Sequence, residues 1–194
     1  GFGGRELRAG RFGDLQIRDG RVAGMKEPSS DAPQSVLLSG LTECHVHLDK
    51  CLTIDRIDQP CGTLAEAMDA QWQDKANWTA EDIRRRASAA LDDLAASGVT
   101  QVRTHVDWTY GADAKVPPMA WHVLCELARD YKQKMTVQVV PLVSIECFAD
   151  LETAEAISAE CVQRSPAIGA FVLGQAELET GVQNLFSVAS KHGL

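Results

Sequence analysis

Residues 79–106 read TAEDIRRRASAALDDLAASGVTQVRTHV, a stretch in which a helix pattern passes directly into a strand pattern and so decides the fold class. Thr79 can cap the helix, with Asp82 three residues further on. Apolar residues then recur at helical spacing, at Ile83, Ala87, Leu91 and Leu94. Gly98 stands where a helix-ending glycine belongs, and a strand is predicted over 101–106.

The same alternation of strands and helices continues on both sides of this stretch. The other predicted strands are 44–48, 135–142 and 167–173, and the other predicted helices are 63–75, 117–132, one capped by Asp150, and 181–192. Four strands, each followed by a helix, imply a parallel sheet with helical crossovers. We therefore predict an α/β fold that is the first half of a (β/α)8 TIM barrel, preceded by a small β module.

The segment before the first barrel strand is predicted to be that β module. Residues 14–18 and 21–25 form short alternating stretches, and the Asp-Gly step at 19–20 between them is a strong hairpin signal. We predict two domains, a small β-strand module over 1–40 and a partial TIM-barrel hydrolase domain with four βα units over 41–194. Half a barrel leaves open sheet edges, so a partner chain supplies the rest, the sequence is a fragment, or the sheet is open and doubly wound.

Composition and charge exclude several classes of partner. The 194 residues carry a formal net charge of −8, which repels phosphate backbones and argues against nucleic-acid binding. No apolar run approaches the roughly 20 residues needed to cross a bilayer, and no secretory signal is visible. The six cysteines are scattered without CxxC spacing and are expected to be reduced. We expect a cytoplasmic protein with no membrane partner, and homo-oligomerisation stays open.

His45 and His47 are the strongest candidates for chemistry. They lie two residues apart in a predicted strand, so both imidazoles project from one face, which Asp49 continues. Two such nitrogens can share one divalent ion, and zinc and iron are both compatible with nitrogen ligands. The alternative is a pair of unrelated polar residues at a strand end.

A second group of polar residues lies on the strand predicted over 101–106. Arg103, His105 and Asp107 share one face of it. If that face points into the barrel, His105 and Asp107 lie beside the metal layer and can orient the ligands. The alternative is a buried His–Asp pair that satisfies its own hydrogen bonds in the core.

Three strings in the chain together resemble a known family. Residues 41–50, LTECHVHLDK, resemble the first-strand signature of the amidohydrolase superfamily. With CGTL at 61–64 and VRTHVD at 102–107, the resemblance is to the cytosine deaminase branch, which includes N-isopropylammelide isohydrolase. The similarity spans about residues 14–194, and these strings indicate the branch but not the substrate.

The resemblance implies a barrel with one divalent metal, zinc or iron, for which His45 and His47 are ligands. The family's further histidines, its catalytic glutamate and its aspartate lie downstream, so the general acid and base are expected beyond Leu194. The implied function is a metal-dependent hydrolase or deaminase of a cyclic amidine or amide, such as a cytosine- or triazine-like heterocycle. It acts on carbon–nitrogen bonds other than peptide bonds. This chain alone is expected to be inactive without a C-terminal half-barrel or partner chain.

The resemblance also implies residues that contact the substrate. Leu64 matches a leucine that lines the pocket, although a core role is equally compatible with it. Ser144 stands where cytosine deaminase has a glutamine, and a hydroxyl cannot present an amide's paired donor and acceptor, which argues against cytosine itself. Lys50 replaces a threonine of cytosine deaminase and favours the isohydrolase. Two alternatives stay open: an amidohydrolase of other cyclic amide or N-acyl substrates, and a non-catalytic fragment that needs a partner.

Overall fold

The computed structural model describes residues 13–27, 38–57, 62–108 and 113–194, and the chain divides into two compact units, 1–39 and 40–194. In the first unit, β1 (Asp14–Arg18) pairs antiparallel with β2 (Arg21–Lys26). Asp19 and Gly20 join the two strands with φ values of 51° and 71°. Positive φ at both central residues is what a tight hairpin turn requires, so the predicted hairpin is confirmed.

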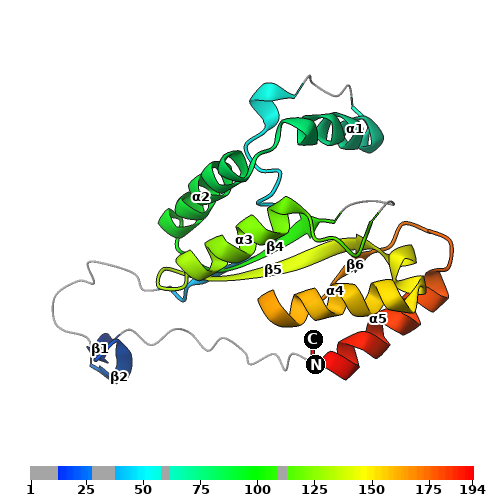
Figure 1. Ribbon diagram of the computed structural model, residues 1–194. Coiled ribbons are helices and arrows are strands. Elements are labelled where there is room, and N and C mark those ends of the chain that lie inside the picture. The colour runs from blue at the N-terminus through cyan, green and yellow to red at the C-terminus, as the bar shows by residue number, and fades with distance from the viewer. Residues whose placement is uncertain (1–12, 28–37, 58–61, 109–112) are drawn as a thin grey trace. The chain divides into compact units, whose positions relative to one another are not determined.

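The second unit alternates strands and helices in the predicted order (Figure 1). Its elements are β3 (Leu41–Val46), α1 (Leu64–Asp74), α2 (Ala80–Ala96), β4 (Val99–Asp107), α3 (Met119–Asp130), β5 (Thr136–Ser144), α4 (Leu151–Arg164), β6 (Ala170–Phe171) and α5 (Leu178–His192). Three short 3-10 helices, η1 (Ile54–Arg56), η2 (Lys75–Asn77) and η3 (Ile145–Ala149), were not predicted. The four strands form one parallel sheet in the order β3-β4-β5-β6.

Side chains cap three of the helices, α1, α2 and α4, whereas α5 was predicted over 181–192 and begins at Leu178 without a side-chain cap. The Thr63 side chain accepts a hydrogen bond from the Glu66 amide, and the Glu66 carboxylate accepts one from the Thr63 amide, which completes a capping box on α1. Asp150 caps α4 by accepting from the Thr153 amide at 2.9 Å. Each cap satisfies backbone amides that a first helical turn leaves without partners.

All four barrel strands differ from their predicted limits, β4 and β5 by one or two residues at each end and the other two by more. The first barrel strand was predicted over 44–48, but β3 ends at Val46 because the chain turns from Leu48. The fourth was predicted over 167–173, but β6 has only two paired residues. Within the described part of the sheet, β6 pairs with one strand only, β5. Few backbone hydrogen bonds between strands are therefore available to extend it, although the segment is apolar.

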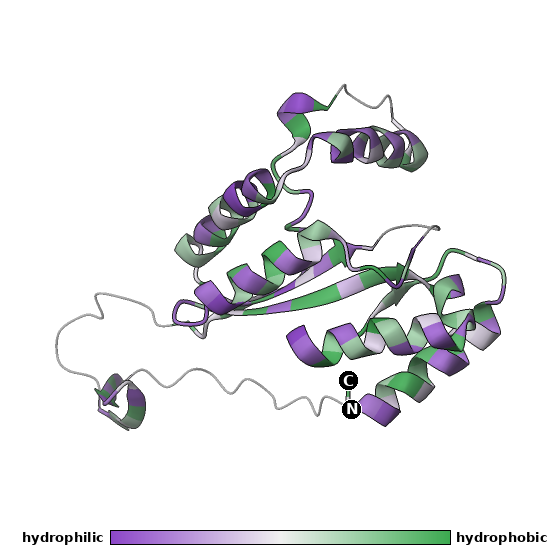
Figure 2. Ribbon diagram, in the orientation of Figure 1, coloured by the Kyte–Doolittle hydropathy of each residue, from purple (hydrophilic) through white to green (hydrophobic). Residues whose placement is uncertain are grey.

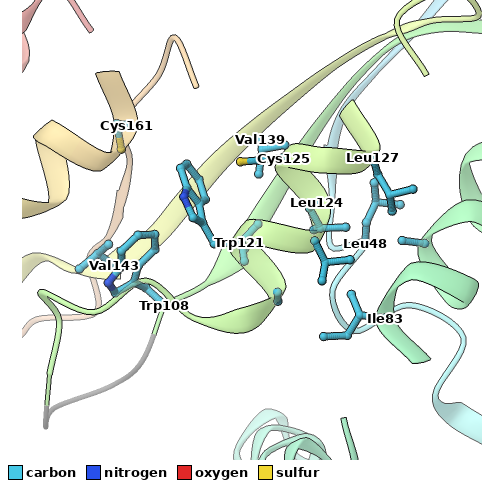
Figure 3. Close-up of a cluster of buried hydrophobic side chains, with 14 of the residues drawn as sticks. Leu48, Ile83, Trp108, Trp121, Leu124, Cys125, Leu127, Val139, Val143 and Cys161 are labelled. Atoms are coloured by element: carbon cyan, nitrogen blue, oxygen red, sulfur yellow. The ribbon is translucent and has the colours of Figure 1, made fainter. Parts of the chain in front are cut away.

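The core lies between the sheet and the helices of its outer side. Along β4, Val102, Thr104 and Val106 are buried, while the alternate residues are more exposed and form the other face of the sheet. Trp121 of α3 and Ile83 of α2 are fully buried against this core (Figure 3). Figure 2 shows the same segregation, since β5 is largely apolar and α2 carries polar residues along much of its length. Among the described cysteines, none is in a disulfide.

No helix in the described ranges has the length and apolar character to cross a membrane.

Candidate functional site

Three histidines meet where β3 and β4 reach their carboxyl ends. The Nε2 atoms of His45 and His47 are 3.3 Å apart. The His45 ring stacks on the His105 ring with a centroid separation of 4.1 Å. The register between β3 and β4 shifts between Glu43 and Val46, so the pairing of the two strands is irregular where His45 lies. The residues expected to project together therefore converge on one location.

His47 is held in its neutral form. Burial lowers its pKa to about 4, and the nearby Lys50 ammonium adds to the effect. Its Nδ1 atom is buried without a hydrogen-bond partner and lies 3.9 Å from Asp107 Oδ1, too far for a hydrogen bond. Burial also lowers the pKa of His105, whose Nδ1 atom is likewise unpartnered. A neutral imidazole keeps a lone pair available to a cation.

Asp107 lies at the end of β4 between two lysines. Lys50 Nζ donates to both of its carboxylate oxygens, at 2.9 and 3.0 Å, and Lys75 Nζ donates to Oδ2 at 3.0 Å. Burial raises the pKa of this carboxyl, but the two ammonium groups outweigh that effect and hold the pKa below its usual range. Asp107 is therefore ionised at neutral pH, beside His47.

Asp49 does not lie where the strand alternation places it. The chain turns after His47, so Asp49 is fully buried and its carboxylate accepts from the backbone amides of Lys50 at 3.0 Å and Asp107 at 2.9 Å. Burial and the charge of Asp107 raise its pKa to about 6. The expectation that Asp49 continues the histidine face was wrong, since a turn replaces the strand there, and Asp49 instead ties the ends of β3 and β4 together.

Arg86 fixes this turn from α2 and was not identified from the sequence. It is 1% exposed, and its Nη1 donates to the carbonyl oxygens of Asp49 at 2.9 Å and Cys51 at 2.7 Å. Its Nε donates to Asp82 Oδ2 at 2.9 Å, so the buried charge is paired. A signal was present in the sequence, because Arg86 falls three residues after Ile83 on the apolar side of the helix.

The two residues expected to contact substrate, Ser144 and Leu64, lie on other elements than the three histidines. Ser144 ends β5, is 4% exposed, and accepts a hydrogen bond from Gln175 Nε2 at 3.2 Å. Gln175, which follows β6, was not identified as a partner, since the two are far apart in sequence. Leu64 begins α1 and is 76% exposed. Cys61, the first residue of the CGTL string, is outside the described residues.

Comparisons with known proteins find deaminases and a related hydrolase that are similar to this chain. No protein-family model matches the chain. A curated pterin deaminase of Rhizobium rhizogenes (strain K84 / ATCC BAA-868) is 28% identical over 169 residues, which cover 79% of this chain and 38% of that protein. The chain thus spans about two fifths of the length of this curated relative.

Solved structures match over nearly the whole chain. The 5-methylcytosine deaminase from Klebsiella pneumoniae liganded with phosphonocytosine matches with a TM-score of 0.75 and 25% identity, over 96% of this chain and 47% of that one. The N-isopropylammelide isopropylaminohydrolase from Burkholderia multivorans ATCC 17616 matches with a TM-score of 0.66 and 22% identity, over 92% and 47%. The predicted fold class is confirmed: the parallel sheet corresponds to about half of a TIM barrel, with a small antiparallel sheet before it.

Proposed function

We propose that this chain corresponds to the N-terminal half of an amidohydrolase-superfamily enzyme, and that it contributes two metal ligands to a heterocycle deaminase or hydrolase. The relatives are named for pterin, 5-methylcytosine and N-isopropylammelide, which all carry nitrogen on a heterocyclic ring. The substrate class that we propose is accordingly a cyclic amidine or amide that loses ammonia or an amine.

The observation that carries this proposal is the 3.3 Å separation of His45 Nε2 and His47 Nε2. Two nitrogens that bind one tetrahedral zinc ion, each at about 2.0–2.1 Å, lie about 3.3 Å apart. Burial keeps His47 neutral, as a metal ligand must be. Within the described ranges no group of three or more His, Cys, Asp or Glu side chains is arranged to hold a metal, so the proposal takes the remaining ligands from outside this chain.

The residues fit a single zinc or iron ion, which when bound supplies the Lewis acidity that makes water nucleophilic at neutral pH. His45 and His47 would hold it. His105 stacks on His45 and fixes the plane of its ring, so we assign His105 an orienting role. Asp107 anchors the Lys50 side chain beside His47 and is kept ionised, so we assign it the same role from the other side.

We assign substrate contacts to Ser144 and Leu64. The Ser144 hydroxyl accepts a hydrogen bond from Gln175 Nε2 and donates one to Glu146 Oε1 at 3.3 Å, so its orientation is set on two sides. The general acid and base are assigned to the complementary C-terminal half-barrel. Of the described carboxylates beside the cluster, both lysines occupy Asp107, and Glu43 accepts from the His45 backbone amide. The isolated chain is therefore proposed to be inactive.

The proposal is tested by metal binding to the purified chain after dialysis against chelator. Calorimetric titration with zinc should give one site, and His45→Gln and His47→Gln should each weaken it by at least about tenfold, since each removes a ligand. His122→Gln is the matched control, because His122 lies on α3 with its side chain 43% exposed. Equal affinity in all four proteins would exclude the assigned site.

Activity is tested with the same chain and its complementary half. Release of ammonia from pterin or cytosine, or of isopropylamine from N-isopropylammelide, is expected only when both halves and the metal are present. Turnover by the isolated chain would contradict the assignment of the general base to the other half. Absence of turnover in the reconstituted protein on all three heterocycles would overturn the proposed reaction.

A further inference from the structure

Helix α1 carries an apolar stripe that the described unit leaves uncovered. Leu64, Met68 and Trp72 are spaced by four residues and therefore lie on one face of the helix. They are 76%, 55% and 53% exposed. An apolar stripe on a surface helix normally faces a core, so this one is available to another group.

A series of side-chain contacts through Lys75 connects this stripe to the histidines. Lys75 follows α1, and its Nζ lies 4.8 Å from the centre of the Trp72 ring. The same Nζ donates to Asp107 Oδ2 at 3.0 Å, and Asp107 Oδ1 lies 3.9 Å from His47 Nδ1. Three consecutive contacts, each shorter than 5 Å, thus join the Trp72 ring to a proposed metal ligand.

Lys75 shares the Asp107 carboxylate with a second lysine, Lys50. Lys50 Nζ already donates to both oxygens of that carboxylate, whereas Lys75 reaches one of them. An ammonium group has three donors, and the Lys75 side chain is 24% exposed, so it keeps capacity for another acceptor. The neighbouring Asp49 carboxylate is fully buried and accepts from backbone amides, not from Lys75.

We propose that Trp72 and Lys75 determine substrate specificity, the Trp72 ring stacking on a planar heterocycle and the Lys75 ammonium pairing with an anionic substituent of it. This inference rests on the proposed function and narrows its substrate class to heterocycles that carry a carboxylate or an ionised ring oxygen. In a chain of net charge −8, a lysine beside an exposed aromatic ring supplies the local attraction that such an anion needs.

The test uses a ligand pair that differs by one charge, pterin and pterin-6-carboxylate, with equilibrium dissociation constants measured by calorimetry on the intact chain. We expect the carboxylate to bind at least about tenfold more tightly than pterin, as for a hydrogen bond between charged groups. Lys75→Gln should abolish this preference, and Lys75→Arg should retain most of it. Trp72→Leu should weaken both ligands together.

Lys134→Gln is the matched control, because Lys134 also lies over an aromatic ring, 5.1 Å from the Tyr131 centroid, and pairs with Asp92 at 3.2 Å. It should leave the preference unchanged. A role for Lys75 in holding Asp107 alone would weaken both ligands equally in Lys75→Gln and leave their ratio intact, which would overturn the inference. So would a wild-type chain that binds both pterins equally or neither. Loss of turnover in the reconstituted enzyme with the binding preference intact would count against the proposed reaction only.

Discussion

At the scale of single residues, the fold shifts the pKa values of two neighbouring groups, His47 and Asp49, in opposite directions. Burial lowers the pKa of His47 to about 4 and raises that of Asp49 to about 6. Both shifts favour the neutral form, because the charged form loses hydration in either case. For His47 the result suits metal binding, since protons compete for the imidazole only in strongly acidic solution.

The His47 shift predicts a pH dependence of stability for the metal-free chain. In the unfolded chain the pKa of this histidine is near its usual value of 6.5, whereas burial lowers it to about 4 in the folded chain. Between these values the unfolded state binds the extra proton, so the contribution of His47 to the free energy of unfolding falls as pH decreases from 6.5 to 4.

His47→Gln removes this contribution, so the variant should gain stability relative to the wild type as pH is lowered through that window. Urea denaturation at pH 7.5 and pH 4.5, with chelator present, measures the difference. His122→Gln serves as the control, with its exposed side chain. A wild-type-minus-variant difference that is the same at both pH values would show that His47 is not desolvated in the folded chain.

At the scale of secondary-structure elements, the contact of α5 with η3 fixes the segment that follows Ser144. Gly181 of α5 is buried against the backbone of Ile145, where a β-carbon would collide with the Ile145 carbonyl oxygen. Asn184 Nδ2 donates to the carbonyl oxygens of Phe148 at 2.9 Å and Ala149 at 3.1 Å. The close approach and the two hydrogen bonds hold η3, and with it the carboxyl end of β5.

Gly181→Ala is therefore expected to destabilise the chain. Glycine to alanine inside a helix ordinarily gains about 1 kcal/mol, but the clash with rigid backbone should reverse the sign, at a cost of about 1–3 kcal/mol. Thermal denaturation followed by circular dichroism measures the change. Ser187→Ala, at an exposed position of the same helix, is the control and should be neutral or slightly stabilising. Stabilisation by Gly181→Ala would mean that α5 does not approach η3 closely.

At the scale of the whole molecule, the four-stranded sheet of the second unit is open, with an edge strand at each side in the described residues. β3 and β6 each pair on one side only within the described part of the chain. After β6, Val172 and Leu173 are 52% and 73% exposed. The inner face of the sheet carries polar groups, among them Arg103, whose Nε donates to Gln138 Oε1 at 2.5 Å. Open edge strands and a polar inner face are expected of half a barrel, and this chain aligns with about half of each structural relative.

Such an edge should make the isolated chain self-associate. Sedimentation velocity over a concentration series is expected to show reversible association, and Val172→Lys should shift the chain toward monomer because a charge at an edge opposes pairing. Val162→Lys is the matched control, since Val162 is also 52% exposed but lies on α4. Equal association in the two variants would show that the β6 edge does not mediate it.

Much of this architecture was predictable because its signals are local. The hairpin at Asp19-Gly20, the caps at Thr63, Thr79 and Asp150, and the order of strands and helices all follow from spacing within a few residues. The His45 and His47 pair belongs to the same class, since a single strand sets it, and the resemblance to the amidohydrolase superfamily is confirmed by the comparisons.

The remainder depended on contacts between distant parts of the chain. The sequence by itself determined the type and order of the main strands and helices and which two imidazoles project together, because backbone geometry over two to four residues fixes both. Only the tertiary structure decided that Asp49 leaves the histidine face, that Arg86 holds the turn, and that Lys75 reaches Asp107 from 32 positions away. The physical reason is that the partner of a buried charge is selected by the packing of α1, α2 and η2 around the strand ends, which no short stretch of sequence encodes.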